Sequence, residues 1–180
     1  MLKISSEQFR AAFLGILLEV ADDFPGQWKS SAEDYSSFMR NNVFRKIANT
    51  FGIANFYTDY YTLDAVFYGV KKTENSSLQS IYAKPIVVAI EHVNSAAGSC
   101  EEMNKLQHFN SPLKVLITYA KEGSETDILL TMYEQIIREA DCFEDIATLR
   151  RQLVVFGEPI TGNNWRFYVY ESAGFKLLNS

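Results

Sequence analysis

This chain of 180 residues has only two cysteines and contains no long apolar run. Cys100 and Cys142 lack CxxC spacing, so they cannot form a disulfide framework or a paired-thiol motif. No segment approaches the ~18 consecutive apolar residues that a membrane helix requires. The first residues lack the basic and then apolar pattern of a secretory signal. We therefore expect a protein of the reducing cytoplasm that has no membrane partner.

Several common catalytic and binding motifs are also missing. Neither GxGxxG nor GxxxxGK[ST] occurs, which argues against a dinucleotide site or a P-loop. His92 and His108 are the only histidines, and neither lies near a second His or a Cys at ligand spacing, so zinc is not expected. Cys100 is close to a predicted helix start, a position that can lower a thiol pKa. A structural thiol is the interpretation that we favour.

Basic residues are fewer than acidic ones, 17 against 22, and the net charge is −5. This balance argues against a broad nucleic-acid-binding surface, because Lys and Arg dominate phosphate binding. Short basic clusters occur at Arg40, Arg45 and Lys46 and at Lys71 and Lys72. Such clusters are most simply solvated faces, but they leave local binding of nucleic acid open.

Hydrophobic residues make up 47% of the chain, and 13 Phe and 10 Tyr are among them. A chain of this length and composition is expected to form one domain, residues 1–180, with its own core. Helical spacing of apolar residues and runs of β-branched residues predict an alternating order of elements. The predicted helices are 6–24, 32–51, 95–109, 126–140 and a short one at 143–149; the predicted strands lie at 56–68 (one or two), 85–92, 113–119, 152–156 and 165–171.

Local signals support these boundaries. Ser5 or Ser6 can cap the first helix, and Ser99 can cap the helix that precedes Phe109. Residues 71–80 read as a polar loop. The whole pattern predicts an α/β sandwich with a central mixed sheet and one continuous core.

Two carboxylates stand out within this pattern. Glu91 comes at the end of the apolar strand 85–92, and Asp64 lies in the aromatic and β-branched stretch 56–68. Charges are rarely buried unless they are paired or bind a metal. If the two strands are neighbours, Asp64 and Glu91 can converge on one ion, and oxygen ligands favour Mg²⁺ or Mn²⁺.

The order helix, strand, strand with Asp64, strand with Glu91, helix, strand resembles the PD-(D/E)XK nuclease superfamily. Leu63-Asp64-Ala65-Val66 and Ile90-Glu91-His92-Val93 match its two short motifs, and the likeness covers Ser6 to Tyr119, about two-thirds of the chain. The resemblance implies a restriction-endonuclease-like fold, Mg²⁺ held by Asp64 and Glu91, and hydrolysis of phosphodiester bonds.

One residue departs from the superfamily pattern. Val93 stands where the Glu-x-Lys motif has its lysine, and it can neither donate a hydrogen bond nor stabilise developing charge. Some members supply the cation from the following helix, where Lys105 is i+4 from Glu101 and i+3 from Glu102. We therefore expect Lys105 to complete the catalytic set with Asp64 and Glu91.

Three further residues are candidates for supporting roles. Asn94 can hydrogen-bond a metal-bound water, and Glu102 can face the ion together with Lys105. Glu19 is the best match for the acidic residue that many members carry on the first helix.

Each of these residues also has a simpler interpretation. Asp64 can mark a turn between two strands, and Glu91 can lie at a sheet edge or pair with an Arg. Lys105 can form a surface ion pair with Glu101 or Glu102. Glu19 can be an ordinary exposed helix residue.

Two functions follow from these readings. The first is a Mg²⁺-dependent nuclease, for which DNA is expected over RNA; the second is a nuclease-like fold without catalysis that binds a partner. Four tyrosines can stack on bases or simply pack the core and the sheet edge: Tyr57, Tyr60, Tyr61 and Tyr68. The closing strand exposes aromatic residues that can form a homodimer or partner surface: Trp165, Phe167 and Tyr168.

Overall fold

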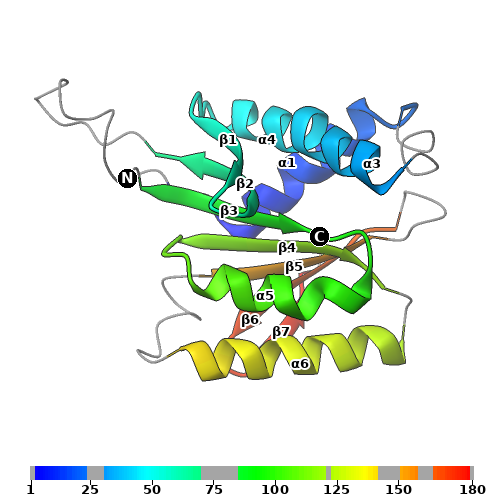
Figure 1. The fold of residues 1–180 in the computed structure, drawn as a ribbon, viewed down its shortest axis with the longest axis vertical. Coiled ribbons are helices and arrows are strands. Elements are labelled where there is room, and N and C mark those ends of the chain that lie inside the picture. The colour runs from blue at the N-terminus through cyan, green and yellow to red at the C-terminus, as the bar shows by residue number, and fades with distance from the viewer. Residues whose placement is uncertain are drawn as a thin grey trace, which may run out of the picture.

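The structure of the protein is a computed structural model that describes residues 3–23, 31–69, 85–120, 123–141, 151–157 and 164–178. A seven-stranded mixed sheet lies between two helical layers (Figure 1). The expected α/β class with a central mixed sheet is confirmed. The predicted polar loop at 71–80, the short helix at 143–149 and Cys142 lie outside the described residues.

The strands lie side by side in the order in which they occur in the sequence. The pairs β1–β2 and β2–β3 are antiparallel, the pairs β3–β4 and β4–β5 are parallel, and the pairs β5–β6 and β6–β7 are again antiparallel. The bounds are β1 Phe56–Tyr60, β2 Leu63–Tyr68, β3 Ile86–His92, β4 Leu113–Tyr119, β5 Arg151–Gly157, β6 Arg166–Glu171 and β7 Gly174–Leu177.

One face of the sheet is covered by α1 (Ser6–Glu19) and by the helix α3–η1–α4. Ser5 caps α1 in a reciprocal pair of hydrogen bonds with Gln8, as the sequence predicts. The predicted helix 32–51 is continuous, but its middle, η1 (Met39–Phe44), is π-helical between α3 (Ala32–Phe38) and α4 (Arg45–Thr50). The π-helical segment changes the helical phase and was not predicted.

The other face is covered by α5 (Ser99–Gln107) and α6 (Ser124–Ala140), and the short 3-10 turn η2 (Ala96–Gly98) leads into α5. The prediction that Ser99 caps this helix is wrong, because Gly98 occupies the N-cap position. The Ser99 hydroxyl is buried and hydrogen-bonds Ala96 and Tyr133 instead. It joins α5 to α6 rather than capping α5.

The apolar core has two parts, one on each face of the sheet. The central strands β3, β4 and β5 are buried on both faces, which is why their sequences are almost continuously apolar. Parallel strands covered by helices on both sides are typical of α/β proteins. The described helices include none that is both long enough and apolar enough to cross a bilayer.

The C-terminal strands differ in part from the prediction. β7, a short and partly exposed strand, was not expected. Phe167 was expected to be exposed but is 2% exposed, because its ring packs against Phe13 on α1. Trp165 and Tyr168 are half-buried.

Candidate functional site

The pairing of β2 with β3 brings Asp64 and Glu91 to neighbouring strands. Ala65 pairs with Ile90, so the next step of the antiparallel register sets Asp64 opposite Glu91. Residues directly opposite one another on antiparallel strands point to the same side of a sheet. The Asp64 Oδ2 atom accepts a hydrogen bond of 2.8 Å from the backbone N–H of His92.

Glu91 is a buried carboxylate with too little positive charge around it. The residue is 1% exposed, and its Oε1 atom lies 2.9 Å from the Lys105 Nζ atom. Burial raises the pKa of Glu91 to about 9, and the nearby Asp64 and Glu102 carboxylates add to the increase, while Lys105 opposes it. Burial therefore favours the protonated form of Glu91 unless a cation beside Lys105 adds to the positive charge at the carboxylate.

Lys105 reaches the site from α5, at the strand end where β3 turns toward that helix. Its ammonium group forms ion pairs with Glu91 and Glu102 and donates a hydrogen bond of 3.1 Å to the backbone carbonyl of Thr62. Burial opposes the charge of Lys105, but the contacts with Glu102 and Glu91 outweigh it and raise the pKa of the lysine. Lys105 is therefore a fixed cation, and it does more than form a surface pair along the helix.

Arg40 is a second cation at this site, and no feature of the sequence distinguishes it from the neighbouring basic residues. It belongs to the π-helical segment η1, and its Nη1 atom lies 3.2 Å from Asp64 Oδ1 and 3.5 Å from Asp59 Oδ1. A π-helical turn shifts the residues that follow relative to the α-helical phase. The contact of Arg40 with Asp64 joins residues 24 apart in the chain, and no local sequence signal predicts it.

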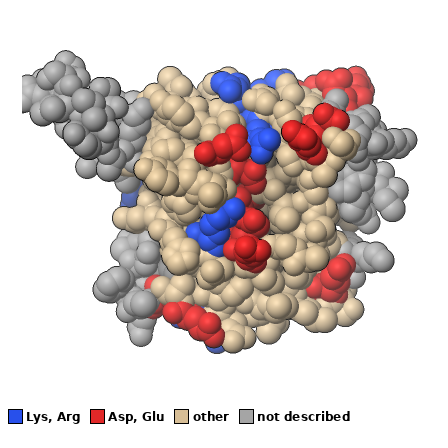
Figure 2. Space-filling view, viewed as in Figure 1, with Lys and Arg blue, Asp and Glu red and all other residues tan. Residues whose placement is uncertain are grey.

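Charges of both signs gather in a band across the middle of this face of the molecule (Figure 2). In the linked contacts, four carboxylates meet two cations, so the fully ionised set carries two excess negative charges. The members of this set are Asp59, Asp64, Glu91 and Glu102 with Arg40 and Lys105.

The oxygen donors and their excess negative charge fit a divalent cation such as Mg²⁺. Among the described residues no three His, Cys, Asp or Glu side chains are grouped closely enough to hold a metal. A Mg²⁺ site does not require three, because this ion usually keeps several waters and uses one or two carboxylates plus substrate phosphate. Asp64 and Glu91 match that smaller requirement.

Asn94 follows β3 and is tied to the opposite helical layer. Its Nδ2 atom donates to the Ala32 carbonyl at 3.0 Å and to the Ser36 hydroxyl at 3.1 Å. Its Oδ1 atom is buried and accepts no hydrogen bond from any described residue. The amide is therefore held in place, with one acceptor left for a water or a ligand.

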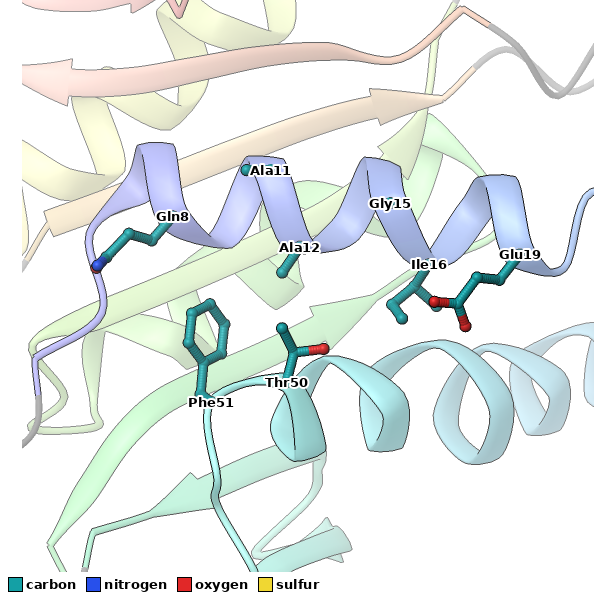
Figure 3. A pocket seen from close by; sticks show the side chains of 8 residues that line it. All are labelled: Gln8, Ala11, Ala12, Gly15, Ile16, Glu19, Thr50 and Phe51. Atoms are coloured by element: carbon teal, nitrogen blue, oxygen red, sulfur yellow. The ribbon is translucent and has the colours of Figure 1, made fainter.

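Glu19 is oriented toward α4. Its side chain is 59% exposed and forms an ion pair of 3.3 Å with Lys46. It lines a groove of about 420 Å³ between α1 and α4, together with Gln8, Gly15 and Phe51 (Figure 3). These contacts favour the simpler reading of Glu19 as an exposed helix residue, and none of them joins it to Asp64 or Glu91.

Two other reactive side chains have structural surroundings. His92 is fully buried on the other side of β3, and burial lowers its pKa to about 4, so it is neutral; its Nε2 atom is 3.0 Å from the Tyr119 hydroxyl. Burial raises the pKa of the Cys100 thiol, which contradicts activation by the helix start and supports the structural reading. Neither side chain is equipped as a nucleophile.

The turn between β1 and β2 is strained and adjoins the site. Tyr60 pairs with Leu63, and both residues between them have positive φ, 46° at Tyr61 and 73° at Thr62; Asp59 has φ 55°. Two-residue turns of this kind favour Asn-Gly, and a β-branched residue there is an outlier. Each such residue costs about 1–3 kcal/mol and persists only when its surroundings hold it.

No protein-family model matches this sequence, and comparison with curated proteins gives no significant match. The function is therefore inferred from the residues of the site and their geometry.

Proposed function

We propose that this protein is a metal-dependent nuclease of the PD-(D/E)XK type that hydrolyses phosphodiester bonds, with DNA as the expected substrate. The observation that carries the proposal is the buried ion pair between Glu91 and Lys105 beside Asp64. A buried carboxylate with a strongly raised pKa, next to a second carboxylate and a fixed cation, is typical of catalytic sites.

The arrangement of elements supports a restriction-endonuclease-like fold. The order α1, β1, β2, β3, α5, β4 is the order on which the sequence resemblance rests, with Asp64 on β2 and Glu91 on β3. The β3–α5–β4 unit joins parallel strands, so α5 packs beside the end of β3 and carries Lys105 to Glu91. Fold alone does not define function, so the weight of the proposal lies on these three side chains.

In this proposal Asp64 and Glu91 would hold Mg²⁺, and Glu102 and Asn94 would have supporting roles beside them. The bound ion supplies positive charge that lowers the pKa of water and neutralises the phosphoryl oxygens. Arg40 contacts Asp64 Oδ1 at 3.2 Å and fixes the orientation of that carboxylate. The surplus of two negative charges in the set gives the site its affinity for a divalent cation.

Lys105 supplies the charge that the Glu-x-Lys lysine supplies elsewhere in the superfamily. In the hydrolysis a water molecule gives up a proton to solvent and its oxygen forms a bond to phosphorus, while the bond to the leaving oxygen breaks and that oxygen takes up a proton from solvent. Because its pKa is raised, Lys105 stays protonated and stabilises the negative charge that develops on the phosphoryl group. One well-placed group of this kind is worth about 3–4 kcal/mol of transition-state stabilisation.

The test is Mg²⁺- or Mn²⁺-dependent cleavage of single- and double-stranded DNA and RNA. Glu91→Gln should abolish cleavage, and Lys105→Ala should lower kcat about 10²–10³-fold. Lys46→Ala is the matched control, because Lys46 also pairs with a glutamate but on an exposed helix surface. Cleavage that survives Lys105→Ala would contradict the catalytic role of that lysine. Absence of cleavage by the wild type would contradict the proposed nuclease activity.

The alternative is a nuclease-like protein without catalysis that binds a partner. Val93 at the usual lysine position and the net charge of −5 favour it. Binding of a DNA or RNA strand without cleavage, in the presence of either Mg²⁺ or Mn²⁺, would favour this alternative.

A further inference from the structure

The β1–β2 turn presents the most exposed aromatic ring among the described residues. Tyr61 is 73% exposed, whereas the next most exposed, Tyr57, is 44% exposed. The Tyr61 ring meets Tyr60 at 4.7 Å between centroids and 78°, so one edge is supported while most of the ring surface stays open to solvent. Tyr60 in turn contacts Tyr68 within β2, which anchors the pair to the sheet.

The two cations of the candidate site hold this turn from both ends. Arg40 lies 3.5 Å from the Asp59 carboxylate, just before the turn. Lys105 binds the carbonyl of Thr62, the residue after Tyr61. The exposed ring is thus one residue away from a direct contact with the proposed catalytic lysine.

The strained backbone is explained by these contacts. Asn-Gly would form the same turn without strain, but it would supply no ring at the tip. Tyr61 and Thr62 keep positive φ, while the contacts of Asp59 and Thr62 with the two cations fix the backbone around them. Strain held in this way beside a site is often functional.

We infer that the turn at Tyr61 is a stacking platform for an unpaired base of a nucleic-acid strand. The inference rests on the proposed function, because it assigns the phosphate of the same strand to the Arg40 and Lys105 side of the turn. A base is joined to its phosphate through one sugar, so a strand whose base stacks on Tyr61 would have its backbone near the turn that Arg40 and Lys105 contact.

The platform should distinguish nucleic acids by whether their bases are unpaired and exposed or stacked within a duplex. A ring can stack on a base face only where the base is not already covered by its neighbours in a duplex. Stacking on an aromatic side chain tolerates any base, so no sequence preference is expected. The substrate class is therefore single-stranded nucleic acid, or a frayed end or loop within a duplex.

Binding of fluorescein-labelled oligonucleotides, followed by anisotropy without divalent metal, tests this inference. The probes are a DNA strand, an RNA strand of the same sequence, and a blunt duplex. Tyr61→Ala should weaken strand binding roughly tenfold and duplex binding less than about twofold, while Tyr61→Phe should bind as the wild type does. Leu18→Ala, on an 80% exposed residue of α1, is the surface control and should change nothing.

A second variant separates binding from folding. The double substitution Tyr61→Asn with Thr62→Gly should relieve strain and raise the melting temperature by about 2–4 °C, yet lose strand binding as Tyr61→Ala does. A purely structural tyrosine predicts the opposite, a lower melting temperature. The DNA and RNA probes decide which strand the platform prefers.

The outcomes distinguish this inference from the nuclease proposal. Strand binding that requires Tyr61, without metal-dependent cleavage, supports the platform and contradicts the nuclease. Metal-dependent cleavage with strand binding unaffected by Tyr61→Ala overturns the platform alone. Absence of binding to every probe overturns the platform, and equal losses for strand and duplex do the same.

Discussion

Two buried charged residues lie on neighbouring parallel strands, Glu91 on β3 and Lys114 on β4, and their surroundings differ. Lys114 is 0% exposed, and its ammonium group donates hydrogen bonds to the carbonyl and side-chain oxygens of Gln107. The Gln107 amide also donates to Gln152, so this polar group is linked to the core by hydrogen bonds. Glu91 instead lies near other carboxylates and shares the single ammonium group of Lys105.

The difference shows that burial of a charge is not by itself a sign of function. We expect Lys114 to stabilise the fold, because its ammonium group has hydrogen-bond acceptors on Gln107. Glu91 remains unbalanced, and a protein that lacked a use for it would be more stable with a neutral side chain there. The two sites should therefore respond to neutral substitution with opposite signs, and the predictions below test that contrast.

Lys114→Met should produce the largest change in stability, a loss of about 2–3 kcal/mol, because the carbonyl and side-chain oxygens of Gln107 lose this buried donor. Chemical denaturation measures it. Cleavage per folded molecule should stay near the wild-type value. A neutral or stabilising effect would show that buried Lys114, like Glu91, lowers the stability of the fold. The proposed difference between the two residues would then be wrong.

His92 should make stability fall in acid. Its pKa is about 4 when folded and 6.5 as an ordinary value, so the unfolded chain binds the proton first as the pH drops below 6.5. The contribution of neutral His92 to the free energy of unfolding is fully present above pH 6.5. It is lost as the pH falls from 6.5 to about 4. Relative to His92→Gln, the wild type should lose about 2 kcal/mol between pH 7 and pH 5. Denaturation curves of both proteins at the two pH values measure this, and parallel curves would contradict a buried neutral imidazole.

Glu91→Gln should stabilise the metal-free protein by about 1–2 kcal/mol at pH 8. The folded pKa, about 9, exceeds the ordinary value of 4.5, so the folded state retains a proton that the unfolded state releases. This group therefore costs stability that grows as the pH rises from about 4.5 to about 9. The advantage of the variant should shrink toward pH 5. A variant that is less stable than the wild type at every pH would place Glu91 in the same class as Lys114.

Glu19→Ala and Lys46→Ala should have the smallest effects, below about 0.5 kcal/mol each, because exposed ion pairs contribute little. Cleavage should also be unchanged in both variants. Thermal melts measure the stability of both variants, and the cleavage assay measures their activity. A loss of cleavage in Glu19→Ala would show that Glu19 belongs to the active site.

The sequence predicted the central strands closely because β3 and β4 are apolar runs bounded by polar or proline-containing segments. It missed β7, whose four residues include exposed ones and carry little apolar signal. It extended α1 to residue 24, whereas the helix ends at Glu19. Boundaries of this kind depend on capping contacts that the pattern of apolar residues does not record.

The candidate site was predictable only in part. Element order alone brought Asp64 and Glu91 to adjacent strands and Lys105 to the following helix. Arg40 and the Thr62 carbonyl were missed, because Arg40 reaches Asp64 from a helix 24 residues earlier in the chain and the carbonyl belongs to a strained hairpin. Both features are set by tertiary contacts, and their sequences carry no mark of them.

The central claim is that Asp64 and Glu91 form a divalent-cation site, and a melting experiment at pH 8 with Mg²⁺ or Mn²⁺ tests it directly. Metal at about 100 times its Kd should stabilise the wild type by about 2.7 kcal/mol, a rise in Tm of roughly 5–10 °C. The Tm of Glu91→Gln should start higher and should not respond to metal. A wild-type Tm that does not change with metal, or an equal rise in Glu91→Gln, would contradict the claim.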